Sequence, residues 1–181
     1  MEDPKPWRHE PVEWLQDCRV FRVGRSQAHS PRGGEPHTFY RIEADDWVNV
    51  VPVTPDDEVV MVRQYRHGSR SVTLEIPGGM IDPGESPGEA AARELLEESG
   101  YRGSSPEPLG SVNPNPALFG NRCYTFLVRD AVPVTAIANS ATEETVVELV
   151  PAERVPDLLA KGIIDHALVV AALYYWSSQR R

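Results

Sequence analysis

Short apolar runs recur along the chain, and their spacing predicts strands and helices in turn. Runs rich in Val, Ile and Leu, bounded by Pro, Gly or Asp, are typical of β-strands. The predicted strands cover residues 47–53, 58–65, 71–76, 109–112, 122–128 and 145–150. Apolar residues at helical spacing predict helices over residues 153–161 and, with Asp165 as N-cap, over 165–177. Mixed strands with helices before and after them indicate an α/β fold, an α/β/α sandwich around a mixed sheet.

The best-specified helix is predicted to begin after Ser86. Ser86 and Glu89 have the spacing of a capping box, and a proline occupies the first helical position between them. Gly100 is expected to stop this helix. Ala92 and Leu96, flanked by Leu95, form the apolar stripe that we expect to pack inward.

The opposite face of this helix concentrates negative charge. Glu94, Glu97 and Glu98 lie at positions i, i+3 and i+4, so their side chains fall on one side of the helix. Each like-charged pair at this spacing costs about 0.2–0.5 kcal/mol of helix stability. A hard divalent cation, which binds carboxylate oxygens, makes such a cluster favourable. The face therefore predicts a Mg²⁺ or Mn²⁺ site; the alternative is an ordinary solvated acidic helix.

The residues around this cluster resemble the signature of the Nudix hydrolases, G-x5-E-x7-R-E-U-x-E-E-x-G-U, where U is a bulky apolar residue. The fixed positions are matched by Gly79, Glu85, Arg93, Glu94, Glu97, Glu98 and Gly100. Tyr101 is aromatic at the last U, where an aliphatic residue is usual. The resemblance extends over about residues 20–175. It implies the Nudix fold and the hydrolysis of a nucleoside diphosphate linked to another moiety, through a divalent metal and an activated water.

The resemblance also implies which residues hold the metal. We expect two or three Mg²⁺ ions, with Mn²⁺ as an alternative. Their expected ligands are the backbone carbonyl of Gly78 and the side chains of Glu94, Glu97 and Glu98, with Glu85 as a further candidate. Arg93 is expected to orient Glu85 through a salt bridge, which makes Arg93 a structural support together with Gly79 and Gly100.

Residues outside the signature resemble those of the ADP-ribose and nucleoside-diphosphate-sugar branch of the family. A proline occurs there at about the distance that separates Pro116 from Tyr101. Leu118 and Phe119 stand near the position where members acting on diadenosine polyphosphates carry a tyrosine. Pro116 is therefore a candidate substrate-binding residue, and a plain loop proline is the alternative.

Arg66 and Glu75 are two further substrate-binding candidates, at or near strand ends. In the relatives an arginine at the position of Arg66 contacts the substrate's phosphate or the acidic core. A guanidinium suits this role because it binds phosphate bidentately and stays charged. Glu75 is expected either to complete the acidic cluster or to face solvent, and Arg66 is alternatively a surface arginine.

The general base has three candidates. Glu94 serves in some Nudix enzymes, whereas the ADP-sugar branch takes its base from a loop ahead of a late strand. Here that segment is residues 139–149, in which the spacing to the strand favours Glu144 over Glu143. Solvation of both loop glutamates remains the alternative. His166 is expected to pack against apolar neighbours, and His67 stays ambiguous.

Members of this branch are typically dimers that exchange N-terminal strands. Residues 1–45, rich in charge, Pro and Gly, are therefore expected to form a small N-terminal β region that makes a homodimer. Residues 46–181 are expected to form the Nudix hydrolase domain. Trp47 either stacks on the substrate's nucleobase or packs in the core or dimer interface.

Composition and charge fit one enzyme that acts on a small substrate. The chain has 181 residues, 40% of them hydrophobic, and a net charge of −9. This charge argues against a nucleic-acid polymer as partner, because phosphate contacts dominate that affinity, but bound cations let an acidic protein hold a pyrophosphate. A charged N-terminus without a long apolar run predicts neither a signal peptide nor a membrane span. Cys18 and Cys123 suggest neither a zinc site nor a disulfide framework, which favours the cytoplasm.

Together these features predict Mg²⁺-dependent hydrolysis of the pyrophosphate bond of ADP-ribose or another nucleoside-diphosphate sugar. The products would be a nucleoside monophosphate and a sugar phosphate. One alternative is a Nudix pyrophosphatase of other specificity, acting on dinucleotides or nucleoside triphosphates. The other is a non-catalytic sensor of nucleotide-sugars, although such members usually lose the signature glutamates that this chain keeps.

Overall fold

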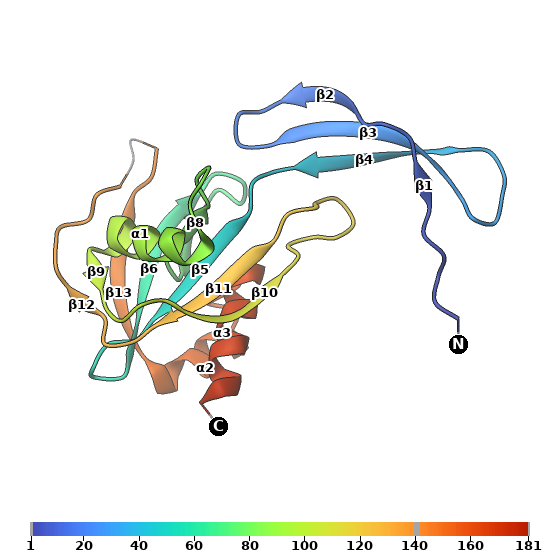
Figure 1. Ribbon diagram of the computed structural model, residues 1–181. Helices are drawn as coiled ribbons and strands as arrows, with labels where there is room; N and C mark the ends of the chain where they lie inside the picture. Colours follow the sequence, from blue (N-terminus) through green and yellow to red (C-terminus); the bar gives the residue numbers. More distant parts are fainter. Residues whose placement is uncertain (1, 140–141, 181) are drawn as a thin grey trace. The chain divides into compact units, whose positions relative to one another are not determined.

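A computed structural model describes residues 2–139 and 142–180 of the chain (Figure 1). The contacts divide these residues into two units. The first unit contains the residues up to Asp45 together with Asn113–Asn121, and the second contains Asp46–Val112 and the residues from Arg122 onward. The division at Asp45 falls where the sequence placed its domain boundary, whereas Asn113–Asn121 belongs to the N-terminal unit.

The N-terminal unit is an antiparallel sheet built around one central strand. Its strands are β1 (Arg8–His9), β2 (Glu13–Asp17), β3 (Arg22–His29) and β4 (His37–Glu43). β3 pairs with β1, β2 and β4. Residues 30–36, which look flexible in the sequence, form the connection between β3 and β4. The segment Asn113–Asn121 joins this unit through a bridge between Phe119 and Ile42.

The second unit contains a mixed set of strands. They are β5 (Trp47–Pro52), β6 (Glu58–Arg66), β7 (Ser71–Glu75), β8 (Gly78–Met80), β9 (Tyr101–Arg102), β10 (Glu107–Val112), β11 (Cys123–Val128), β12 (Val132–Pro133) and β13 (Thr145–Pro151). One ladder runs β10-β11-β5-β8 and another β13-β6-β7. The β11–β5 pair is parallel and the other pairs in these ladders are antiparallel. The predicted strands are all present, with ends shifted by a few residues.

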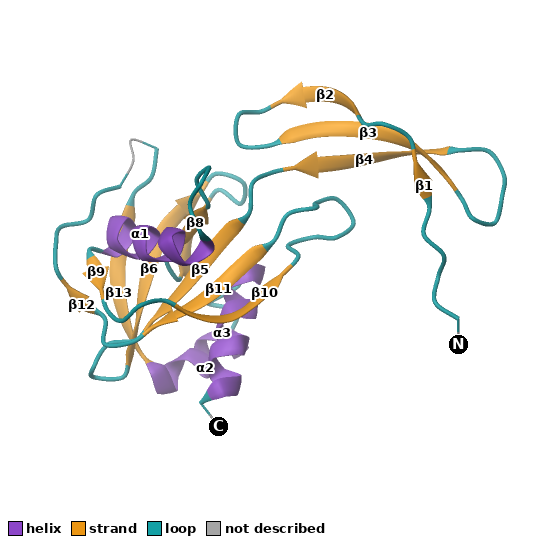
Figure 2. Ribbon diagram, viewed as in Figure 1, coloured by secondary structure: helices purple, strands orange, loops and turns teal. Residues whose placement is uncertain are grey.

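Helices cover both faces of these strands (Figure 2). The helical segments are α1 (Pro87–Ser99), the 3-10 turn η1 (Ala152–Arg154), α2 (Val155–Ala160) and α3 (Ala167–Gln179). Val48 and Val50 of β5 pack with α1, whereas Val51 packs with α3. This alternation along a strand is the expected consequence of side chains pointing to opposite faces. The α/β/α sandwich with a mixed sheet is thus confirmed. Within the described residues, none of these helices has the length and apolar character needed to span a bilayer.

Local capping chemistry places α1 as predicted. Ser86 and Glu89 form a capping box in which each side chain accepts a hydrogen bond from the other residue's backbone N–H. Gly100 ends the helix in the left-handed conformation, with φ of 74°. This conformation favours glycine because a side chain would crowd the backbone.

Two details of the helices differ from the predictions. The buried face of α1 contains Ala91, Leu95 and Glu98, whereas Ala92 is exposed. The predicted stripe was right at Leu95 and wrong at Ala92, and it placed all the acidic residues on the outer face, whereas Glu98 accepts a hydrogen bond from the backbone of Gly78 in β8. The N-cap of α3 is His166 rather than Asp165, and no side chain caps it.

Candidate functional site

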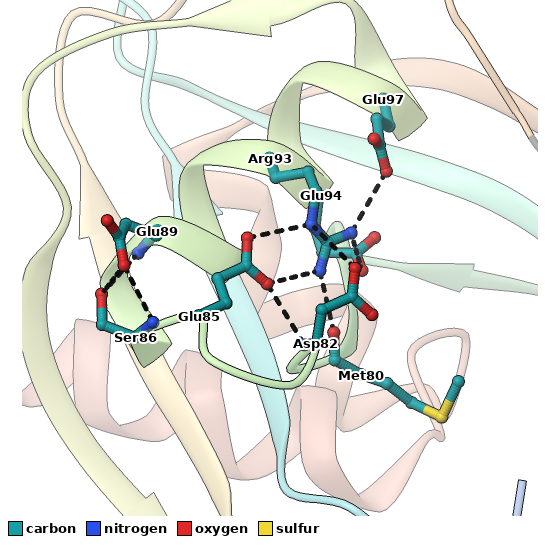
Figure 3. Close-up of polar contacts among 8 residues, drawn as sticks. All are labelled: Met80, Asp82, Glu85, Ser86, Glu89, Arg93, Glu94 and Glu97. Carbon is teal, nitrogen blue, oxygen red and sulfur yellow. Dashed lines mark hydrogen bonds and ion pairs between the residues drawn. The ribbon is translucent and has the colours of Figure 1, made fainter.

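The guanidinium of Arg93 contacts three glutamates, Glu85 in the loop before α1 and Glu94 and Glu97 on α1 (Figure 3). Arg93 Nε and Nη2 donate to the two oxygens of Glu85 at 3.0 and 2.9 Å. Arg93 Nη1 donates to Glu94 at 2.7 Å and to Glu97 at 3.2 Å. Arg93 Nη2 also donates to the backbone carbonyl of Met80 at 2.9 Å. The predicted Arg93–Glu85 salt bridge is present, and the same side chain neutralises part of the acidic face.

Glu98 is the most deeply buried carboxylate of this face, with 5% of the residue exposed. The backbone N–H of Gly78 donates to Glu98 Oε2 at 2.9 Å. Burial raises the pKa of Glu98 to about 8, the Gly78 hydrogen bond opposes that shift, and the charges of Glu94 and Glu143 add to it. Burial also raises the pKa of Glu94, against the opposing effect of Arg93.

The glycines before α1 allow this close approach. A Cβ at Gly79 would collide with the carboxylate of Glu94, and a Cβ at Gly78 would collide with the backbone of Val48 and the side chain of Asn49. Gly78 therefore lets β8 lie close to β5, and Gly79 leaves room for the carboxylate of Glu94 from α1. The sequence named both glycines, but the contacts that require them come from β5 and α1.

The chemistry of this donor set fits a divalent cation. The charges of Glu94 and Glu143 raise the pKa of Glu98, the charge of Glu143 also raises the pKa of Glu94, and bound positive charge relieves such repulsion. Among the residues that the structure describes, no three His, Cys, Asp or Glu side chains already converge on one ion-sized point. Arg93 instead holds the oxygens of Glu85, Glu94 and Glu97. Arg93 takes both oxygens of Glu85 but only one oxygen each of Glu94 and Glu97, so the second oxygen of Glu94 and of Glu97 has no bond to Arg93.

A pocket of about 770 Å³ opens beside the acidic face. This volume is in the range of small-molecule sites. Glu94 and Glu97 of α1 line the pocket, and so do Glu143 and the N-terminal end of α3. Residues 66–69, at the end of β6 and just after it, also line the pocket, as do the start of β5 and residues of β7 and β8. All of these residues belong to the second unit.

Arg66, which lines this pocket, forms a salt bridge with Glu75, which is not among the lining residues. Arg66 Nε and Nη2 donate to the two oxygens of Glu75 at 2.8 and 2.7 Å, and Thr73 Oγ1 donates to Glu75 at 2.6 Å. Only 1% of Glu75 is exposed, so the solvent-facing alternative is wrong. Burial opposes the charge of Glu75, but the hydrogen bonds from Arg66 and Thr73 outweigh it and lower the pKa. Arg66 lines the pocket, so it is not an isolated surface arginine.

The two loop glutamates differ in position. Both are exposed, but Glu143 lines the pocket and Glu144 is not among the lining residues. The electrostatic effect of Glu143 reaches Arg66, Glu94 and Glu98. The geometry therefore favours Glu143 as the general base, whereas the sequence spacing favoured Glu144. Ser140 and Ala141 of the same predicted segment lie outside the described residues.

The remaining candidates separate into two groups. Trp47, half-buried at the start of β5, lines the pocket, which is compatible with both of its predicted roles. Pro116 is exposed in the N-terminal unit and is not among the pocket-lining residues. Its role as a substrate-binding residue stays a prediction.

Two pocket residues were missed or undervalued in the sequence. Asn49 Nδ2 donates to the backbone carbonyl of Leu168 at 3.1 Å and so connects β5 with α3. A single Asn inside the apolar run of residues 47–53 is the signal that would have found it. His166, expected only to pack, lines the pocket with Nδ1 at 3.6 Å from Glu75 Oε2. No signal in the sequence brings His166 to Glu75, because the two residues lie on separate elements.

The Arg66–Glu75 pair generates a prediction about acid stability. The folded protein holds the pKa of Glu75 below its ordinary value of 4.5, so the unfolded chain takes up this proton first as the pH falls. The free energy of unfolding of wild type should therefore exceed that of Glu75→Gln above about pH 4.5. This difference should shrink as the pH falls below about 4.5 and through the lower pKa of Glu75 in the folded state. Urea unfolding of both proteins, in metal-free buffer from neutral to acid pH, measures this difference. A difference in unfolding free energy that stays constant with pH would contradict the assignment.

Comparison with known proteins agrees with this geometry. The NUDIX domain matches residues 45–173, which is more than half of the chain. The chain is 32% identical over 127 residues to the ADP compounds hydrolase NudE of Escherichia coli (strain K12), covering 70% of this chain and 67% of that one. It is 35% identical over 135 residues to an ADP-ribose pyrophosphatase of Saccharomyces cerevisiae, covering 68% and 56%.

A solved structure extends the similarity to nearly the whole chain. The crystal structure of an ADP compounds hydrolase matches with a TM-score of 0.86 and 26% identity, over 99% of this chain and 96% of that one. The signature residues on α1, the α/β/α sandwich around them and the matching domain lead to one conclusion: the chain belongs to the Nudix hydrolase family.

Proposed function

We propose that this protein hydrolyses the pyrophosphate bond of ADP-ribose or another nucleoside-diphosphate sugar, giving a nucleoside monophosphate and a sugar phosphate. The observation that carries this proposal is one pocket lined by both the acidic face of α1 and the guanidinium of Arg66. Such a pocket combines groups suited to a metal with a group suited to a phosphate. The names of the relatives, an ADP compounds hydrolase and an ADP-ribose pyrophosphatase, support the substrate class.

Nudix hydrolases generally need a divalent metal, and we propose two or three Mg²⁺ or Mn²⁺ ions here. The proposed ligands are the carbonyl of Gly78 and the carboxylates of Glu94, Glu97 and Glu98. Glu85 suits a supporting role better, because Arg93 takes both of its oxygens. When bound, the metal neutralises charge on the pyrophosphate and lowers the pKa of the attacking water.

Glu143 is the proposed general base. Its carboxylate takes a proton from a water whose oxygen forms the new bond to phosphorus, while the bridging P–O bond breaks and its electrons leave with the departing phosphate. Arg66 holds a phosphate group, and Glu75 keeps the guanidinium of Arg66 in place. Glu94 suits the base role less well, because Arg93 already donates to one of its oxygens.

The proposed substrate is a small nucleotide-sugar, and neither a nucleic-acid polymer nor a membrane is a proposed partner. A homodimer formed by the N-terminal unit is part of the proposal. It is supported by exposed large apolar residues on β2 and β4, among them Trp14, Leu15, Phe39 and Tyr40. Light scattering at micromolar concentration decides between monomer and dimer.

A cytoplasmic location is proposed from the two free cysteines, Cys18 and Cys123, and cell fractionation tests it.

A substrate panel tests the function directly. Phosphate released through an added phosphatase would be measured with ADP-ribose, GDP-mannose, UDP-glucose, NADH and dATP in the presence of Mg²⁺. The phosphatase acts on the monoester products and not on the internal diphosphate of a nucleotide-sugar or NADH. For dATP, whose terminal phosphate a phosphatase removes directly, inorganic pyrophosphatase replaces it and reports the released pyrophosphate. We expect the highest kcat/KM with a nucleoside-diphosphate sugar. A preference for NADH or dATP would establish the dinucleotide or triphosphate alternative, and binding without any release would establish the sensor.

Matched loop variants test the base. Glu143→Gln should lower kcat on the preferred substrate by about 10²–10⁴-fold, which is the usual contribution of a positioned general base. KM should change little, because the amide keeps the size of the side chain. Glu144→Gln is the matched control and should retain kcat. A large loss in Glu144→Gln alone would restore Glu144 as the base, and near-normal kcat in both variants would point to Glu94.

A further inference from the structure

The C-terminal end of α1 is bonded on two sides by the segment that carries Glu143. The last carbonyls of an α-helix have no partner within the helix. Here the backbone N–H of Ala138 donates to the carbonyl of Glu97 at 2.9 Å. The hydroxyl of Thr145 donates to the carbonyl of Glu98 at 2.6 Å. The two carbonyls therefore belong to proposed metal-binding residues, and their partners flank Glu143 in the sequence.

Thr145 is the side chain that makes this connection. It opens β13, and only 5% of the residue is exposed. Its Oγ1 also lies 2.9 Å from the side-chain amide of Asn139. Both neighbours, the carbonyl of Glu98 and Oδ1 of Asn139, are acceptors, and the single hydroxyl proton of Thr145 goes to the closer one, the carbonyl of Glu98. The hydroxyl thus connects α1 to the residue that follows the Glu143 loop, and Asn139, which precedes that loop, lies beside it.

A hydroxyl is not what packing alone selects at this position. Valine has the same shape and suits the start of a buried strand at least as well, because β-branched residues favour strands. Burying a hydroxyl costs free energy unless it is hydrogen-bonded. The hydrogen bond from Thr145 to Glu98 therefore offsets that cost, and it does so at the junction between the helix and the loop.

We propose that Thr145 is a positioning residue for proton transfer, because its hydroxyl fixes the carboxylate of Glu143 relative to the metal-binding face of α1. This inference rests on the proposed role of Glu143 as general base. Glu143 lies on an exposed loop, two residues before Thr145, and has to reach a water beside Glu94 and Glu98. Displacing a reacting group by about 1 Å can cost about 10²-fold in rate. A fixed point next to Glu143 prevents such a displacement.

Two substitutions at one position test the proposal. Thr145→Val keeps the shape and removes the hydroxyl, and it should lower kcat by about 10–10²-fold, the range expected for a misplaced catalytic group. KM and the Mg²⁺ concentration for half-maximal activity should stay unchanged. Thr145→Ser keeps the hydroxyl and should restore most of kcat. Thr54→Val is the matched control, because Thr54 is a buried threonine that bonds the backbone of Glu58 outside the pocket. Its kcat should remain normal, whatever its melting temperature.

A double-mutant cycle separates positioning from a general loss of stability. If Thr145 acts through Glu143, Thr145→Val should have no further effect on kcat in the Glu143→Gln background. The same fold loss in both backgrounds would overturn the proposal. So would normal kcat in Thr145→Val, failure of Thr145→Ser to restore kcat, or normal kcat in Glu143→Gln.

A readout without turnover keeps this inference separate from the proposed function. Hydrogen exchange of the backbone preceding Thr145 should be faster in Thr145→Val than in wild type, and close to wild type in Thr145→Ser. Inactivity of wild type on every substrate of the panel would overturn the proposed function, and the positioning role with it, even if exchange showed the anchor. Unchanged hydrogen exchange in Thr145→Val would overturn only the proposed positioning role of Thr145 and would not affect the proposed hydrolase function.

Discussion

The second unit, which contains α1, largely shields the carboxylates of Glu94 and Glu98 from water and places them close enough for the charge of Glu94 to raise the pKa of Glu98. Charges in such a position are costly unless a partner neutralises them, because the interior of a protein solvates ions poorly. Several features of the site answer this one constraint. Gly79 leaves room for the carboxylate of Glu94, the N–H of Gly78 donates to Glu98, and Arg93 donates to Glu94. These partners leave the pKa of Glu98 at about 8, so the neutralisation is incomplete. We propose that a divalent cation supplies the remaining positive charge.

Beside the pocket, a second buried carboxylate, that of Glu75, is stabilised by different partners. Glu75 is as deeply buried as Glu98, but its two oxygens are bonded by Arg66 and Thr73, and its pKa is lowered. Glu75 therefore needs no metal, and it fixes the guanidinium of Arg66 at the pocket. The pocket lining thus includes carboxylates of α1 whose charge is only partly neutralised and the guanidinium of Arg66, which Glu75 holds in place. These two kinds of group suit a substrate whose phosphates contact both a metal and a guanidinium.

Local chemistry explains which parts of the fold were predictable from the sequence. The capping box at Ser86 and the C-cap at Gly100 depend on residues within one turn, so the limits of α1 were predicted closely. The buried face of α1 was not, because the burial of Glu98 depends on Gly78, twenty residues earlier in the chain. The contact between Glu75, at the end of β7, and His166, the N-cap of α3, likewise joins two separate elements. The pattern of apolar residues along the sequence cannot indicate such a contact. The spacing that favoured Glu144 over Glu143 failed to anticipate the pocket lining, because the path of that loop depends on contacts between Thr145 and α1.

The central claim is that buried carboxylate charge on α1 is what a divalent metal relieves, and melting temperature with and without Mg²⁺ tests it most directly. A ligand that binds the folded state raises stability by mass action. Wild type should melt at a clearly higher temperature in saturating Mg²⁺ than in chelator. At a pH above 8, where the carboxylate of Glu98 is charged, Glu98→Gln removes that charge and keeps the shape; it should be at least as stable as wild type in chelator and should gain little from Mg²⁺. Equal Mg²⁺-dependent shifts in the two proteins, or none in wild type, would contradict the account.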